Sequence, residues 1–488
     1  MTDPLNQAKE IFLQGLISLE KNDFKSAELL FTSALLLAPD RESILINLST
    51  TQILLEKWND VLVTCEKLLH KFPKSQEGLI NHAIAYAHLN QPKKSLFLIN
   101  KALSLNADSY EAWSNKGIFL LDLFRFDEAI LCFKKALQIN SKSIEALIGI
   151  GNVKNQYKKY SEALNYFNYA LKIDINNPKA NLNKGMSLIR LGDFREGWKL
   201  FEYRWQVTGT KEFKKFQNIP LWLGDKPLQN KTLIIWAEQG FGDTIQFSRY
   251  IPILLNENPG LKIIASVPNA LINLFKGLHK DILVASEELE AITGEFQCPI
   301  MSLPYALKST LQTIPNMTPY IYPEAFIIEK WRKKLQEISI TPNNNLFNSI
   351  FRIGLCWEGS GKYATQLNPR RNVDPELIQK LVSEIAAKNL KIEFHSLQIM
   401  PAPPELKIFS HHNLLTDFNE TAGLICNMDL VVSVDTSVAH LSGALNKRTF
   451  LMIPDPPDFL SPIEGDRNPW YPETLIFRQM QSNSWAEP

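Results

Sequence analysis

The chain has 488 residues, which suggests about three domains of ordinary size. Its 52 lysines and arginines nearly balance its 51 aspartates and glutamates, so composition gives no reason to expect nucleic acid or an anionic membrane surface as a partner. The first residues are polar, and no apolar run reaches the roughly 18 residues of a membrane span, so we expect a cytoplasmic protein without a membrane span.

A pattern with a period of 34 residues covers the N-terminal part of the chain. The marker Ala-x-x-x-Phe-x-x-Ala begins at Ala27, Ala129 and Ala163, and a glycine stands twelve residues before each of these alanines. This pattern resembles the tetratricopeptide repeat (TPR), in which each unit is a pair of helices and stacked units form a solenoid. We expect five full units over about 8–177 and a partial sixth, marked by Gly185, Gly197 and Phe201, within a repeat domain of residues 1–205.

Such a stack has a concave surface that can bind peptides or other proteins. Asparagines are frequent on the predicted first helices of the units, and their amides could hold an extended backbone or be solvated. The alternative is that the repeats only support the following domain or a dimer. The sequence does not identify a ligand for this groove.

A turn-rich, charged segment, residues 206–230, is the expected linker to a region of alternating strands and helices. In the first lobe, 231–325, we expect strands at 232–237 and 262–267 and helices at 244–256 and 270–278. Residues 326–350 form an expected hinge. In the second lobe, 351–488, strands are predicted at 352–357, 391–397, 430–434 and 449–453, with helices at 375–388, 422–427 and 438–445. This order predicts two parallel α/β sheets.

The first candidate for chemistry is the loop after the first predicted strand, where Glu238, Gly240, Gly242 and Asp243 precede a helix. The two glycines permit a tight backbone and close approach of a ligand, and a carboxylate at Asp243 could take a proton from an acceptor hydroxyl. The alternative is that Asp243 only caps the helix.

The second candidate follows an apolar strand, where Asp435, Thr436 and Ser437 begin a helix that carries His440 one turn further on. Ligands bind beyond the carboxyl ends of parallel strands, and a helix N-terminus there attracts phosphate. A third candidate is the basic loop with Lys362, Arg370 and Arg371, which could neutralise a diphosphate or simply be solvated.

Several segments together resemble bacterial TPR glycosyltransferases related to the heptosyltransferases. They are Trp236 to Pro252, Ser302-Leu303-Pro304, Ser396-Leu397-Gln398, Asp435 to His440 and Asn468 to Pro472. The resemblance implies a GT-B fold of two Rossmann-like lobes and inverting transfer from a nucleotide sugar without a metal or other cofactor. It also implies that Asp243 is the acceptor base, that Asp435, Thr436 and His440 bind the donor phosphates, and that Gln398 lies near the nucleotide. Residues Trp470 to Arg478 would cross back to the first lobe.

We therefore expect a glycosyltransferase in which a nucleoside-diphosphate sugar meets a glycan or protein acceptor between the two lobes, with the TPR groove binding the acceptor or a partner protein. One alternative is a non-catalytic TPR adaptor whose C-terminal lobes bind a nucleotide sugar or nothing. A second is protein glycosylation like that of the O-linked N-acetylglucosamine transferases. The five cysteines are scattered in apolar surroundings without Cys-x-x-Cys spacing, so we expect buried thiols rather than metal ligands.

Overall fold

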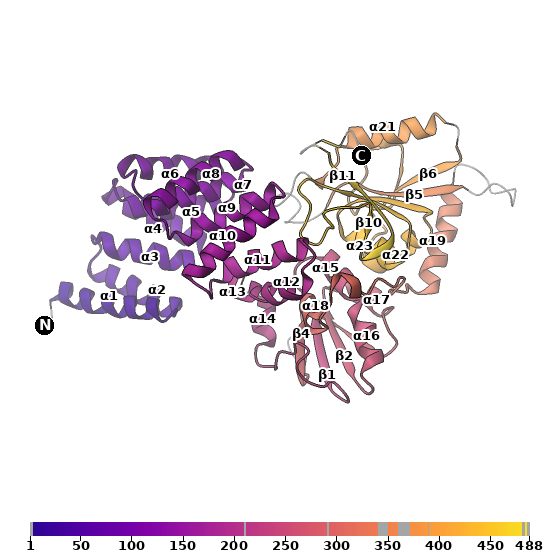
Figure 1. Ribbon diagram of the computed structural model, residues 1–488, viewed down its shortest axis with the longest axis horizontal. Helices are drawn as coiled ribbons and strands as arrows, with labels where there is room; N and C mark the ends of the chain where they lie inside the picture. The colour runs from indigo at the N-terminus through magenta and orange to yellow at the C-terminus, as the bar shows by residue number, and fades with distance from the viewer. Residues whose placement is uncertain are drawn as a thin grey trace. The chain divides into compact units, whose positions relative to one another are not determined.

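The computed structural model describes residues 3–208, 211–289, 292–339, 350–359, 371–388, 390–480 and 484–485. The chain forms two compact units, Met1–Asn183 and Lys184–Pro488 (Figure 1). Within the described ranges, no helix has the length and apolar character needed to cross a membrane.

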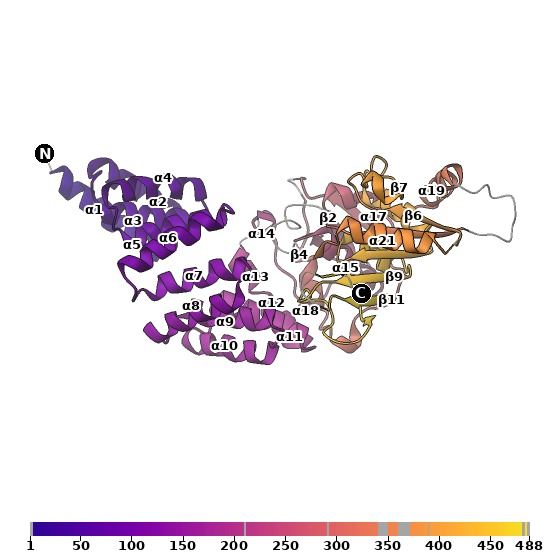
Figure 2. The same cartoon turned by 90° about the horizontal axis from the view of Figure 1, so that it is seen from above.

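The first unit is a succession of antiparallel helix pairs, which Figure 2 shows following one another in chain order. The pairs are α1 (Pro4–Glu20) with α2 (Phe24–Leu37), α3 (Glu42–Leu54) with α4 (Trp58–Lys71), α5 (Gln76–His88) with α6 (Pro92–Leu105), α7 (Tyr110–Asp122) with α8 (Phe126–Ile139), and α9 (Ile144–Gln156) with α10 (Tyr160–Ile173). The predicted TPR helix pairs are therefore confirmed.

Glycine and phenylalanine hold these pairs together as the repeat pattern predicts. A Cβ atom added at Gly117 would lie 2.5 Å from the ring of Phe133, and one added at Gly149 of the next pair would lie 2.3 Å from the same ring. Phe133 is fully buried. The ring of Phe133 thus fills space inside its own repeat and space against the next repeat. Only glycine at both positions leaves room for the ring.

The turn between the two helices of each pair also repeats. Asn22, Glu56, Asn90, Phe124 and Lys158 are spaced 34 residues apart, and each has a positive φ of 55–60°. The series continues at Gly192, where φ is 85°. This residue lies between α11 (Pro178–Arg190) and α12 (Phe194–Phe201), so a sixth repeat-like turn joins these two helices.

The second unit contains two sheets. The first has the order β3-β2-β1-β4 with all strands parallel, and its strands are β1 (Thr232–Trp236), β2 (Lys262–Val267), β3 (Ile282–Ser286) and β4 (Phe296–Pro299). Its helices are α15 (Phe241–Phe247) and α16 (Tyr250–Glu257), which follow β1, and α17 (Ile272–Phe275). The helix predicted over 244–256 is therefore two helices.

The second sheet has the order β10-β11-β9-β8-β5-β6-β7 and is parallel except for β10. Its strands are β5 (Phe351–Cys356), β6 (Ile392–Ser396), β7 (Phe409–Ser410), β8 (Leu430–Val434), β9 (Thr449–Ile453), β10 (Arg467–Asn468) and β11 (Tyr471–Arg478). Its main helices are α21 (Pro375–Ala386), α22 (Phe418–Cys426) and α23 (Ser437–Ala444). The mixed α/β region with parallel sheets is thus confirmed.

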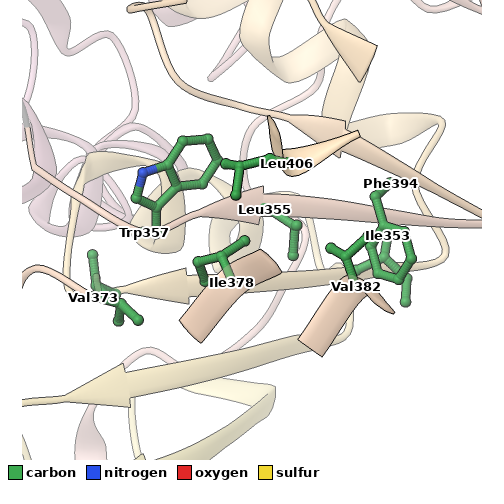
Figure 3. Close-up of a cluster of buried hydrophobic side chains, with 9 residues drawn as sticks. Ile353, Leu355, Trp357, Val373, Ile378, Val382, Phe394 and Leu406 are labelled. Carbon is green, nitrogen blue, oxygen red and sulfur yellow. The ribbon is translucent and has the colours of Figure 1, made fainter. Parts of the chain in front are cut away.

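The core of the second sheet forms where α21 covers β5 and β6. Ile378 and Val382 of α21 pack with Leu355 of β5 and Phe394 of β6, and Trp357 lies at one end of the cluster (Figure 3). All five side chains are buried. These contacts fix the carboxyl ends of β5 and β6, where the site residues follow.

One expectation for the second unit needs correction. Tyr471–Arg478 is a strand of the second sheet paired with β9, so this segment does not cross to the first lobe. At the start of the segment, two residues do contact the first lobe: the Trp470 carbonyl accepts a 2.6 Å hydrogen bond from Arg249, and the ring centre of Tyr471 lies 4.5 Å from the same guanidinium. The expected hinge, 326–350, begins with α19 (Ala325–Ile338), in agreement with the helical and then asparagine-rich sequence of this segment, and residues 340–349 lie outside the described part.

Candidate functional site

The candidate loops lie at the two places where strand order reverses in the sheets. In the first sheet, β2 lies on one side of β1, and the later strand β4 lies on the other side. In the second sheet, β6 lies on one side of β5, and the later strand β8 lies on the other side. In open parallel sheets, ligands bind beyond the carboxyl ends of the strands at such switch points. Asp243 follows β1, Arg371 follows β5 and Asp435 follows β8.

Asp243 is the third residue of α15 and lies partly exposed near its start. Its Oδ2 atom accepts a hydrogen bond of 3.2 Å from the backbone N–H of Gly240, so it does cap the helix. Burial, followed by repulsion from Asp458 and Asp435, raises the pKa of Asp243 to about 7. The two roles weighed from sequence are therefore compatible, because a capping carboxyl with this pKa can also accept a proton near neutral pH.

The N-terminus of α23 follows β8 directly. The Oγ1 atom of Thr436 lies 3.2 Å from Ser433 Oγ and 3.5 Å from Cys356 Sγ, and among the described contacts it makes no capping bond to the helix. Ser437, the first residue of α23, is partly exposed. The first N–H groups of this helix are therefore placed to receive an anion from outside the helix.

The start of α15 lies against the start of α23. A Cβ atom added at Gly242 would lie 2.8 Å from His440 Cδ2 and 3.5 Å from the Cα atom of Ser437. Glycine at this position therefore allows the approach that brings the Asp243 helix and the Asp435 turn together. The structure thus places these two sequence-predicted motifs side by side.

The neighbours of His440 assign its tautomer. His440 Nδ1 lies 3.1 Å from the hydroxyl of Tyr471, while Nε2 lies 3.7 Å from Oδ1 of Asp435. The Tyr320 hydroxyl lies farther from that of Tyr471, at 3.5 Å, and donates to the carbonyl of Ile245. We infer from these distances that Tyr471 donates to Nδ1, which leaves the proton on Nε2, facing Asp435.

A buried arginine stands behind this histidine. Arg249 donates to the carbonyls of Pro315 and Trp470 and to the hydroxyl of Tyr320, and its guanidinium lies 4.5 Å from the ring centre of Tyr471. Burial and the charge of Arg249 lower the pKa of His440 to about 4. His440 is therefore a neutral hydrogen-bond donor. Arg249 and Tyr471 lie within segments that carry the resemblance and Tyr320 does not, but none of the three was assigned a role from sequence, because their contacts form only in the fold.

Gln398 is tied to the same edge of the second sheet. It follows β6 and is buried, and its Oε1 atom accepts a bond of 2.8 Å from the thiol of Cys356. Cys356 in turn lies beside Thr436. The thiol expected to be merely buried therefore links the carboxyl ends of β5, β6 and β8. Of the other cysteines, Cys65, Cys132 and Cys298 are buried and Cys426 is partly buried.

Of the three candidate cations, Arg371 lies at the site. Its Nη2 atom would be 2.2 Å from a Cβ added at Gly359, and its charge opposes the rise in the pKa of Asp435 that burial causes. The Nε atom of Arg371 is buried and has no hydrogen-bond partner among the described residues. A guanidinium in this state can bind an oxyanion. Lys362 and Arg370 lie outside the described residues.

Asp458 and Arg190 are site residues that the sequence analysis missed. Asp458 lies in the loop after β9 with an exposed side chain, and loss of solvation among the surrounding loops together with repulsion from Asp435 raises its pKa. Arg190, at the end of α11, donates to the carbonyl of Pro457 at 3.2 Å. The Pro-Asp-Pro-Pro-Asp sequence at 454–458 was the available signal, because it is a turn at the carboxyl end of a predicted strand.

Glu238 differs from the prediction that it lines the loop at the ligand site. Its side chain is buried, and both carboxylate oxygens accept bonds of 2.9 Å from Arg204 of α13 (Arg204–Thr208). Its Oε1 atom also accepts from the N–H of Met301. The physical reason is that a buried carboxylate needs a partner that offsets its loss of hydration, and Arg204 provides two hydrogen bonds and a positive charge. Glu238 therefore anchors the loop instead of facing a ligand.

A cavity of about 500 Å³ lies elsewhere, between the end of α19 and the segment from Phe409 to Leu414. One of its lining residues is His411, whose Nε2 lies 3.1 Å from Nδ1 of His395, and burial lowers the pKa of His395 to about 3 and that of His411 to about 4. None of the predicted site residues lines this cavity. Among the described residues, no group of three or more His, Cys, Asp or Glu is arranged to hold a metal ion.

The fold defines a chain with TPR repeats followed by an α/β unit that has two parallel sheets. Residues 110–143 match the family model described as the tetratricopeptide repeat. The chain is also 23% identical over 323 residues to protein FlbA of Caulobacter vibrioides, and the match covers 61% of this chain and 51% of FlbA. The chain thus spans about half the length of this curated relative.

The solved structures similar to the chain include a TPR protein. A thermophilic TPR protein of Thermus thermophilus is 19% identical, with coverage of 37% of this chain and 99% of that chain and a TM-score of 0.36. PilF of Pseudomonas aeruginosa is 15% identical, with coverage of 44% and 98% and a TM-score of 0.34. The presence of TPR repeats rests on the family match and on the helix pairs of the chain itself, and such repeats support protein–protein interaction.

Proposed function

We propose that the chain is an inverting glycosyltransferase of the GT-B type, which transfers a sugar from a nucleoside-diphosphate sugar to a glycan or protein acceptor in the cytoplasm. The observation that carries the proposal is the close approach of the Asp243 helix to the Asp435 turn through Gly242 and His440. Each motif belongs to the switch point of its own sheet. A two-substrate transfer needs such an arrangement, with acceptor chemistry on one side and donor chemistry on the other.

In this proposal, Asp243 takes the proton of an acceptor hydroxyl, and the oxygen then attacks the anomeric carbon of the donor sugar. The bond from that carbon to the diphosphate breaks, and the diphosphate leaves with the bonding electron pair. The N-terminus of α23, the Nε2–H group of His440 and Arg371 stabilise the leaving diphosphate, with Lys362 and Arg370 as further candidates. Gln398 lies near the nucleotide, and no metal or other cofactor takes part.

The TPR groove would bind the protein acceptor or a separate protein partner. Several asparagines first considered for this role already have partners in the repeats: Asn47 and Asn115 donate to backbone carbonyls one turn earlier, and Asn81 donates to Ser49 and Thr50. Transfer to protein side chains, as in the O-linked N-acetylglucosamine transferases, is a variant of the same proposal. A non-catalytic TPR adaptor is the alternative from another class.

The test separates chemistry from binding. In Asp243→Asn, we expect sugar transfer to fall at least about 100-fold, as for loss of a general base, while the affinity for nucleoside diphosphate stays unchanged. In Arg371→Ala, we expect nucleotide affinity to fall as well. Unchanged transfer by Asp243→Asn would remove Asp243 as the base. Failure of the wild-type protein to release nucleoside diphosphate from ADP-, UDP- or GDP-sugars with peptide or glycan acceptors would favour the adaptor.

A further inference from the structure

A row of exposed apolar side chains crosses the second helices of the first four repeats. It consists of Leu29 on α2, Val63 on α4, Phe97 on α6 and Leu131 on α8, each 34 residues from the next (Figure 1 shows these helices). Their exposed fractions are 69%, 51%, 68% and 66%. Single exposed apolar residues are ordinary, but the same position in four successive repeats places them on one face of the stack. In the fifth repeat this position is the polar Asn165.

Three lysines accompany the row. Lys67, Lys101 and Lys135 stand four residues after Val63, Phe97 and Leu131, so each lies one helical turn further along the same face. All three are exposed. Among the described residues, none of them forms an ion pair, whereas other lysines in this unit do, such as Lys57 with Glu28. The face is therefore both apolar and basic.

We propose that this face, Leu29, Val63, Phe97 and Leu131 with Lys67, Lys101 and Lys135, docks an acidic amphipathic helix of a partner protein. The second helices of neighbouring repeats lie too far apart to pack closely on each other, so the positions of the row are more than one helix-packing distance, about 10 Å, apart. An amphipathic helix presents a continuous apolar stripe along its length, and about 28 residues of it rise about 42 Å, enough to pass several of these positions. An extended peptide would turn alternate side chains away from the row. The lysines select glutamate or aspartate beside the apolar positions.

The test uses a fluorescent 28-residue helical peptide with a continuous leucine stripe on one face and glutamates beside it, measured by anisotropy against the full chain. We expect saturable binding that Phe97→Ser with Leu131→Ser weakens at least tenfold. The matched control is Leu54→Ser on α3, a residue that is 47% exposed and outside the row, and it should leave binding unchanged. Lys101→Glu with Lys135→Glu should weaken binding of the glutamate peptide and strengthen binding of the same peptide with lysine in place of glutamate.

Three outcomes would overturn the proposal. The first is no saturable binding of the glutamate peptide, or binding that the row variants leave unchanged. The second is sedimentation of the chain with phosphatidylserine vesicles that depends on the row, without peptide binding, which would make the face a membrane contact. The third is self-association in sedimentation velocity that the row variants abolish, which would make a second copy of the chain the occupant.

Discussion

Loss of solvation is the largest cause of the raised pKa values of Asp243, Asp435 and Asp458, and repulsion from neighbouring carboxyls adds to the rise for Asp243 and Asp458. Electrostatic repulsion of this kind destabilises the folded state, and it is found mainly where function requires it. Arg371 and Arg190 offset part of the repulsion. An anionic ligand at this site would therefore have to bind mainly through the start of α23 and the cations.

The pKa of Asp243 leads to a stability prediction. Because the folded pKa, about 7, lies above the ordinary value of 3.8, ionisation of Asp243 lowers the free energy of unfolding progressively as pH rises from about 4 to 7. Asparagine cannot ionise but can still accept the bond from Gly240. We expect Asp243→Asn to be more stable than wild type by roughly 1–3 kcal/mol at pH 8 and to show no gain at pH 4.

Chemical denaturation at both pH values measures this difference. Glu257→Gln, an exposed carboxyl at the end of α16, is the control and should change stability little at either pH. A gain for Asp243→Asn that is equal at pH 4 and pH 8 would contradict the assigned cause.

The tautomer of His440 gives a second prediction. In wild type, imidazole 15N chemical shifts should show a neutral ring with the proton on Nε2 at pH 7. Tyr471→Phe removes the hydroxyl that donates to Nδ1, so the population should shift toward the Nδ1–H form, with a stability loss of about 1 kcal/mol. A wild-type ring protonated on Nδ1, or no change in the variant, would exclude this role for Tyr471.

At the level of single residues, the sequence predicted contacts within a motif better than contacts between distant segments. Asp435 to His440 could be identified because a strand, a turn and a helix are adjacent in the chain. Tyr471 and Arg249 could not, because the first acts from a strand 31 residues beyond His440 and the second from the other sheet's helices. Burial of Glu238 depended in the same way on Arg204, 34 residues earlier.

At the scale of the elements, the turn within each TPR helix pair contains one residue with a strained, left-handed backbone, and this residue recurs every 34 positions. Left-handed backbone costs a residue with a Cβ roughly 1–2 kcal/mol, and four residue types other than glycine occupy this position: Asn22, Glu56, Asn90, Phe124 and Lys158. The helix pairs hold the turn through the bond from the N–H of Glu56 to the carbonyl of Ile53 and its equivalents. The 34-residue period predicted the pairs, but it did not reveal which turn residue is left-handed.

Glu56 tests this strain because its side chain is exposed. We expect Glu56→Gly to raise the free energy of unfolding by up to about 1 kcal/mol, since relief of the left-handed strain exceeds the extra entropy of glycine in the unfolded chain. Glu56→Ala removes the same charge but keeps a Cβ, so it should give no such gain. Thermal unfolding of both variants decides the question, and equal stabilities would rule out strain at this turn.

At the scale of the whole molecule, alternation of strands and helices predicted two parallel sheets, and strand order then placed the candidate loops at their switch points. The four-residue strand β4 and the five-residue edge strand β3 were not predicted, and β11 was not predicted as a strand because the resemblance, not the local sequence, decided how Trp470 to Arg478 was interpreted. The repeat period and the type of sheet can be predicted because they depend on local sequence. The order of strands in a sheet cannot be predicted in this way, because it depends on contacts between segments that are far apart in the chain.

Nucleotide binding should be measurable as a change in stability. A nucleoside diphosphate at about 100 times its dissociation constant should stabilise the chain by about 2.7 kcal/mol in a thermal-shift panel of ADP, UDP and GDP. Arg371→Ala should remove most of this shift, whereas Arg332→Ala on the exposed face of α19 should not. The same shift in all three proteins would place the nucleotide away from Arg371.

The pair of Arg204 and Glu238 determines where the chain can be divided. A fragment that begins at residue 206 would keep Glu238 and lose Arg204, leaving a buried carboxylate without its cation at a cost of about 3–5 kcal/mol. The end of the helical region therefore folds as part of the α/β unit. Exchange of repeat arrays between proteins of this architecture, by recombination or by engineering, would have to leave α13 with the sheets it serves.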